Sequence, residues 1–146
     1  MEKINIKYAK ILPVKDPKWE YGNNGIDFYT PDNMPTIELL PGEIHKFSLG
    51  IKFELPDDIY IYICNKSSWG ALGVDTMCPL IDTNYRGELH CVLKNANPSK
   101  SFILRPGIKI CQGIIMQQPR FELKQTNYIS ADTNRGENGF GSTGQE

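Results

Sequence analysis

The sequence predicts an all-β protein, a distorted β-barrel or jelly roll with one short helix, and two patterns support this prediction. Apolar and polar residues alternate with the period of two that is typical of strands, in segments rich in Ile, Phe, Tyr and Val. Turn-forming sequences separate these segments at the spacing of a barrel or sandwich. The expected strands span 4–11, 44–55, 59–64, 87–94, 109–116 and 120–124, and the expected turns lie at 41–43, 55–58, 96–100 and 105–107.

One segment favours a helix instead of a strand. Residues 67–72, SSWGAL, provide one or two helical turns with a serine as the N-cap. The chain has 146 residues, and a domain of that size buries roughly 68–70% of its unfolded surface without needing a disulfide or a metal. We therefore expect a single β-barrel domain over residues 1–130, followed by a flexible glycine-rich arm over residues 131–146.

The charge and the apolar content exclude several classes of function. The formal net charge is −1 and the positive residues are scattered, so we expect no nucleic-acid partner. No apolar run approaches the roughly 18 residues that a membrane span needs, and the N-terminal sequence MEKINIKYAK has no apolar signal region. These observations predict a soluble, cytoplasmic protein with no membrane partner.

The four cysteines give no sign of a metal centre. Cys64, Cys78, Cys91 and Cys111 lie in or beside apolar stretches, and no two of them form a C-x-x-C pair. The two histidines lie far from any ligand spacing. We expect the cysteines to be small buried core residues, and we expect no zinc site.

Five segments contain polar residues that strand packing does not explain, at 23–30, 65–73, 77–91, 107–115 and 134–144. In the first, Asp27 interrupts an apolar strand after an Asn-Asn-Gly turn, and its carboxylate either faces solvent or has a function. In the second, Lys66, Ser67 and Ser68 lead into the expected helix, where free amide groups suit a phosphate. An ordinary helix cap beside a surface lysine is the alternative.

The remaining segments also allow two interpretations each. Asp82 precedes a Thr-Asn turn, where an aspartate commonly accepts hydrogen bonds from turn amides, and Tyr85 then leads into a new strand. Gln112 lies within an apolar strand; an inward amide without partners costs roughly 1–3 kcal/mol, whereas an outward one costs nothing. The glycine-rich tail has no helix after it, unlike an ordinary phosphate loop, so it is either disordered or closes over a site built elsewhere.

Taken in order, the five segments resemble the five motifs of the trimeric all-β dUTP diphosphatases, the dUTPases, over residues 20–144. NNGIDFY resembles the family's A-G-x-D-L, NKSS its P-R-S-[SG], and LIDTNYRGEL its [VL]-I-D-x-x-Y-R-G-E. GIKICQ resembles G-D-R-I-A-Q, and RGENGFGSTG resembles R-G-x-x-G-F-G-S-T-G. The third and fifth matches are the specific ones. The resemblance implies Mg²⁺-dependent hydrolysis of dUTP to dUMP and pyrophosphate by a homotrimer, in which each arm crosses to close a neighbouring subunit's site.

The resemblance also implies a role for each matched residue. Asp82 would hold the sugar 3′-OH and orient or deprotonate the water that attacks the α-phosphorus, and the Tyr85 ring would pack on the deoxyribose and reject a 2′-OH. Uracil would be held by backbone groups of a hairpin around Thr76–Leu80, with Phe140 stacked above it. The triphosphate would contact Lys66, Ser67, Ser68, Gln112, Arg135, Gly141, Ser142 and Thr143. Asp27 would hold Mg²⁺ through water.

Several positions depart from the family pattern. Lys66 replaces an arginine and loses its planar fork, and Asn65 replaces a proline. Pro79 stands where glycine is usual and removes an N–H from the expected uracil hairpin. Ile108 and Lys109 replace aspartate and arginine. A deoxycytidine-nucleotide deaminase of the same fold, and a homologue that binds a regulatory protein, remain alternatives; the complete tail counts against the deaminase.

Overall fold

The computed structural model describes residues 2–141 and consists almost entirely of β-strands. Two four-stranded sheets have the strand orders β1-β4-β8-β6 and β2-β10-β5-β7, and β3 pairs with β9 in a two-stranded sheet. Every pairing is antiparallel. The elements are β1 (Lys7–Lys10), β2 (Gly25–Tyr29), β3 (Ile37–Leu39), β4 (Ile44–Glu54), β5 (Ile59–Cys64), α1 (Ser67–Gly70), β6 (Val74–Met77), β7 (Leu80–Ile81), β8 (Glu88–Asn95), β9 (Phe102–Leu104) and β10 (Lys109–Gln117). The described residues contain no helix long and apolar enough to cross a membrane.

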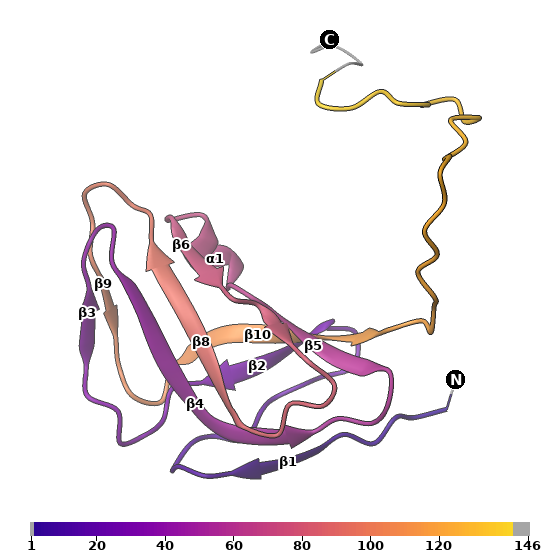
Figure 1. Ribbon diagram of the computed structural model, residues 1–146. Coiled ribbons are helices and arrows are strands. Elements are labelled where there is room, and N and C mark those ends of the chain that lie inside the picture. Colours follow the sequence, from indigo (N-terminus) through magenta and orange to yellow (C-terminus); the bar gives the residue numbers. More distant parts are fainter. Residues whose placement is uncertain (1, 142–146) are drawn as a thin grey trace.

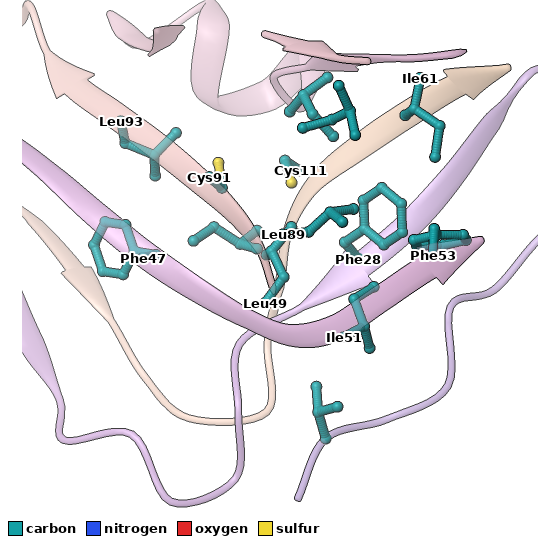
Figure 2. Close-up of a cluster of buried hydrophobic side chains, with 14 of the residues drawn as sticks. Phe28, Phe47, Leu49, Ile51, Phe53, Ile61, Leu89, Cys91, Leu93 and Cys111 are labelled. Carbon is teal, nitrogen blue, oxygen red and sulfur yellow. The ribbon is translucent and has the colours of Figure 1, made fainter. Parts of the chain in front are cut away.

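The core lies between the two larger sheets, because their strands turn alternate side chains inward. Along β8 buried residues alternate strictly with half-buried ones, and β5 buries every second residue. Figure 2 shows side chains from β2, β5 and β10 facing those from β4 and β8. The rings of Phe28 and Phe53 meet edge to face with their centroids 6.0 Å apart. This packed interior holds in place the strand ends that carry the site.

The structure confirms most of the expected strands and corrects one. The strands predicted at 44–55, 59–64, 87–94 and 109–116 form β4, β5, β8 and β10 with bounds that differ by at most one residue, and the predicted turns separate strands. The strand predicted at 120–124 is absent. The amide of Gln118 still donates to the Asp58 carbonyl over 2.7 Å, but Pro119 follows, and residues 120–124 pair with none of the strands that the structure describes.

The short helix forms, but its predicted cap is wrong. α1 is four residues long, and its N-cap is Lys66, with no side-chain hydrogen bond. Ser67 is the first residue inside the helix, so its hydroxyl does not accept from the first-turn amides as a capping serine would. The two serine hydroxyls are exposed instead.

The cysteines divide between the core and the surface. Cys91 and Cys111 are fully buried, as predicted, and their sulfur atoms lie near each other between the sheets (Figure 2). Cys64 is half-buried. Cys78 is exposed, which corrects the prediction, because it lies in the crossing from β6 to β7 with a φ of 52°. The described residues contain no group of three or more His, Cys, Asp or Glu placed to hold a metal ion.

After β10 the chain leaves the barrel as an extended arm (Figure 1). An ion pair of 3.1 Å from Arg120 to Asp58 ties the start of the arm to the body. Beyond it, the large apolar side chains are largely exposed: Phe121 68%, Leu123 89%, Tyr128 79%, Ile129 81% and Phe140 112%. The predicted division at residues 130 and 131 stays a prediction, while β10 itself ends at Gln117.

Candidate active site

A polar cavity of about 350 Å³ lies where β2, β10 and α1 meet. Six residues line it: Asp27, Lys66, Ser67, Ser68, Lys109 and Gln112. The strand register explains this gathering, because Gln112 on β10 pairs with Asp27 on β2 and with Cys64 at the end of β5. Lys66 and the two serines follow β5 directly. A neighbouring cavity of about 630 Å³ shares Asp27, Lys109 and Gln112 and extends towards Lys18 and Asn23. We call the smaller cavity and its six residues the cationic cavity.

The cationic cavity carries more positive than negative charge. Lys109 Nζ lies 3.0 Å from Asp27 Oδ2, and both side chains are partly exposed. Lys66 Nζ lies 4.3 Å from the centre of the Trp69 ring. Partial burial, and then the neighbouring charge of Lys109, lower the pKa of Lys66 below its ordinary value of 10.5, while Asp27 opposes this shift. Two ammonium groups facing one carboxylate, beside two hydroxyls, make a site suited to an anion such as a polyphosphate.

The Gln112 amide faces this cavity and is held in place. Its Nε2 donates to the Asn65 backbone carbonyl over 3.2 Å, which answers the question of whether an amide in this apolar strand has a partner. A methyl group on Gly25 of β2 would overlap the Gln112 side chain, so the glycine leaves room for the amide. The hydrogen bond to Asn65 and the space beside Gly25 together keep the Gln112 amide in the cavity.

A second cavity, of about 410 Å³, surrounds Asp82 and is lined also by Tyr60, Leu80, Thr83, Asn84 and Gln118. Asp82 lies in the predicted turn, since its carbonyl accepts from the Tyr85 amide over 3.1 Å. The Thr83 hydroxyl donates to the Ile59 carbonyl over 2.6 Å and fixes the turn to β5. The carboxylate of Asp82 is exposed and is left free to accept hydrogen bonds from a ligand or water. We call this the aspartate cavity.

Tyr85 lies beside this turn with its ring 42% exposed. Its hydroxyl donates to the Glu88 carbonyl over 2.8 Å, which fixes the ring against the start of β8. Tyr85 is not among the residues that line the aspartate cavity, but its exposed part is available to a ligand bound beside the turn.

The hairpin expected around Thr76–Leu80 does not form. β6 pairs with β8 in one sheet, and β7 pairs with β5 in the other, so residues 76–80 cross between the sheets. Thr76 is half-buried and Leu80 is 56% exposed. The carbonyl of Pro79 accepts from the Ile63 amide over 2.7 Å, so this proline is joined to the sheet through its oxygen.

The two cavities lie apart within one chain. Asp82 lies beside Tyr60, and Gln112 lies beside Cys64. Tyr60 and Cys64 are four residue steps apart along β5, which is about 13 Å at the usual strand rise. The arm contributes to neither: beyond Gln118, no described residue lines either cavity. Arg135 Nε donates within the arm to the Asn138 carbonyl over 2.8 Å. Phe140 and Gly141 have φ values of 44° and 82°, and Ser142 and Thr143 lie outside the described residues.

Lys109 is the residue of this site that sequence reasoning missed as a candidate. It stands out in the sequence only as a departure at the start of an apolar strand. Its backbone pairs with Tyr29, whereas Asp27 pairs with Gln112, and a bulge lies between Lys109 and Cys111. From this position the Lys109 side chain reaches Asp27. A bulge of this kind redirects a side chain and leaves no signal in composition.

The dUTPase family profile matches residues 18–144. The chain belongs to the dUTPase family. A deoxyuridine 5′-triphosphate nucleotidohydrolase of Clostridium novyi is 35% identical over 148 residues, covering 99% of this chain and 96% of that protein. Phage dUTPases whose sequences are less similar to this chain share its fold.

Two solved structures illustrate the shared fold. The Staphylococcus bacteriophage 80alpha dUTPase with dUpNHpp superposes with a TM-score of 0.86 at 19% identity, covering 98% of this chain and 100% of that one. A mutant dUTPase of the Staphylococcus aureus phage phi11, described as showing the coordination of a structural Mg(II) ion, has a TM-score of 0.77 at 16% identity. It covers 86% of this chain and 98% of the phage protein.

Proposed function

We propose that this dUTPase family member hydrolyses dUTP to dUMP and pyrophosphate, in a site that combines the aspartate cavity of one chain with the cationic cavity of another. The observation that carries the proposal is the separation of the two cavities along β5. One holds the Asp82 carboxylate, with the partly exposed Tyr85 in the adjoining turn, and the other holds two ammonium groups, two hydroxyls and an amide. A nucleoside triphosphate needs both sets of groups, and one chain does not bring them together.

Asp82 acts on the water in this proposal. Its exposed carboxylate accepts a hydrogen bond from water and from the sugar 3′-OH, and takes the proton as the water oxygen bonds to the α-phosphorus. The bond from the α-phosphorus to the bridging oxygen breaks, and pyrophosphate leaves. The open side of the Tyr85 ring packs on the deoxyribose, where an added 2′-OH would clash. Backbone groups of the segment from Thr76 to Leu80 hold the uracil base.

The cationic cavity receives the phosphates. Lys66, Ser67, Ser68 and Gln112 provide charge and hydrogen bonds, and Lys109 joins them as a second cation. Triphosphate binding would relieve the repulsion between the two lysines, which lowers the pKa of Lys66 in addition to the larger effect of partial burial.

The residues present fit a Mg²⁺ ion held through water. Asp27 is a partly exposed carboxylate at the edge of the cavity, which suits an ion that keeps most of its water shell. Such an ion would neutralise charge on the phosphate oxygens. Asp27 must exchange its contact with Lys109 for the metal-bound water, which leaves the Lys109 ammonium available to the phosphates.

A homotrimer with exchanged arms would complete the site. The large apolar side chains of the arm, from Phe121 to Phe140, are not covered by the described part of their own chain. The body has an apolar groove of about 720 Å³ lined by Ile4, Ile6, Trp19, Ile26, Ile114 and Ile115 among others. Both surfaces suit contacts between subunits. The arm would then place Arg135 on the γ-phosphate, Phe140 on the uracil, and Gly141, Ser142 and Thr143 along the phosphates.

A panel of nucleotides tests the proposed function. Purified protein with Mg²⁺ is expected to release pyrophosphate from dUTP far faster than from dTTP, dCTP or UTP. Asp82→Asn should lower kcat by about 10²–10⁴-fold. The matched control is Asp57→Asn, which changes an exposed carboxylate outside both cavities. Absence of dUTP turnover, or an Asp82→Asn variant as active as wild type, refutes the proposal; ammonia release from dCTP would instead identify the deaminase.

A regulatory role is a second candidate. The 80alpha dUTPase is described as controlling the transfer of virulence genes by a G protein-like mechanism. This chain shares its fold, and a regulatory protein partner for it would be compatible with dUTP hydrolysis. If the wild-type protein captures one defined partner protein, and the Asp82→Ala variant captures it as well, this role is supported. If the folded Asp82→Ala variant captures no partner, the result argues against it.

A further inference from the structure

Gly87 lies between Tyr85 and strand β8, and its missing side chain leaves the space that the Tyr85 ring occupies. A Cβ atom at position 87 would lie 2.5 Å from the Tyr85 hydroxyl oxygen and 2.6 Å from Cζ, with Cε2 at 3.0 Å. Atoms do not approach so closely without displacement. Gly87 is not among the described glycines with positive φ, so its backbone conformation is open to alanine. What requires glycine at this position is therefore the aromatic ring.

The backbone around this contact is firmly held. Arg86 Nη1 donates to the Thr83 carbonyl over 2.7 Å and to the Tyr85 carbonyl over 3.2 Å. The Tyr85 amide donates to Asp82 over 3.1 Å and closes the turn. The Tyr85 hydroxyl donates to the Glu88 carbonyl over 2.8 Å, and this is the side-chain hydrogen bond that holds the ring. A methyl group at position 87 would therefore rotate the ring and break this bond, while the turn stays in place.

We propose that Gly87 is a positioning residue that sets the orientation of the Tyr85 ring, and through it the rejection of ribonucleotides. The inference rests on the proposed function, in which that ring packs against the deoxyribose. A ring excludes a 2′-OH only while it is in van der Waals contact with the sugar. When the ring rotates away from Gly87, the contact opens and the extra hydroxyl is admitted.

Three variants test this inference: Gly87→Ala, Tyr85→Ala and the double variant. The measured quantity is the ratio of kcat/KM for dUTP to kcat/KM for UTP. Gly87→Ala is expected to lower this ratio about tenfold. In the Tyr85→Ala background the same substitution should change nothing further, because the ring it displaces is gone. An unchanged ratio in Gly87→Ala, or an equal fall in both backgrounds, overturns the inference.

A crystal structure of Gly87→Ala provides a measurement that does not depend on activity. The Tyr85 hydroxyl should have moved beyond hydrogen-bonding distance of the Glu88 carbonyl, and an unmoved ring overturns the inference. A wild-type protein without dUTP turnover refutes the proposed function, while this structure still decides the role of Gly87. Should Gly87→Ala fail to fold, folding of the double variant would confirm the clash. Failure of both would mean that the backbone needs the glycine, and would overturn the inference.

Discussion

Replacing Lys109 by methionine tests whether Lys109 binds the phosphates while Asp27 serves the Mg²⁺ ion. The Lys109–Asp27 pair of 3.0 Å has side chains that are 43% and 24% exposed, so its net effect on folding is at most about 1 kcal/mol. Its effect on a polyphosphate is larger, because a lost charge-assisted hydrogen bond costs about 1.5–3 kcal/mol. Even the lower end of this range raises KM for dUTP about tenfold. The Asp27 carboxylate, freed of its partner, should meanwhile bind Mg²⁺ more readily.

The assay is the initial rate of pyrophosphate release, measured against dUTP at saturating Mg²⁺ and against Mg²⁺ at saturating dUTP. Lys109→Met should raise KM and lower the Mg²⁺ concentration that gives half the maximal rate. Direct titration of Mn²⁺ binding to the nucleotide-free protein provides a readout apart from activity. Lys46→Met, which changes an exposed lysine on β4, is the control. An unchanged KM, or a higher requirement for metal, would refute the reasoning.

Three further predictions follow from the packing and the arm. Gly113→Ala should destabilise the fold by about 1–3 kcal/mol in urea unfolding, because the new Cβ would lie 2.6 Å from Phe28 Cε2 and 2.9 Å from Ile61 Cγ2; an unchanged midpoint would contradict this. Removing residues 134–146 should lower kcat/KM for dUTP about 100-fold or more and leave the melting temperature unchanged; full activity would rule out the arm as a lid. The hydrogen bond to Cys91, together with burial, raises the pKa of Cys111 above its ordinary 9.0, so the folded state keeps a proton that the unfolded state loses. The free energy of unfolding should therefore fall as the pH rises above 9.0, and a Cys111→Ala variant should show a smaller decline.

The sequence predicts the barrel well where a strand's own pattern decides its structure. Residues 59–64 alternate between buried and exposed sides and form β5 with the predicted bounds. Asp82 lies in the turn that its neighbours Thr83 and Asn84 predict. In these cases the periodicity and the turn residues are local, so the chain carries the information within a few positions.

The prediction fails where structure depends on distant partners. Residues 120–124 have a strand pattern, but they pair with no strand among residues 2–141. Cys78 looks like a core residue in sequence, yet the crossing between sheets exposes it. The contact of Lys109 with Asp27 forms between two strands, beside a bulge in their register, and the gap between the two cavities depends on the register of β5 with β7 and β10. A motif can name the residues of a site, but it does not say which chain supplies each one.

Mixed oligomers of two variants test most directly whether the two cavities of one site come from different chains. Asp82→Asn lacks the carboxylate proposed to act on the water. A Lys66→Met, Gln112→Ala double variant lacks two of the side chains proposed to bind the phosphates. Each protein alone should therefore be inactive. When equal amounts are unfolded together and refolded, about one quarter of the sites should combine the intact half of each chain and recover dUTP hydrolysis. If the mixture stays as inactive as its components while light scattering shows mixed oligomers, each chain builds its own site and the account is wrong.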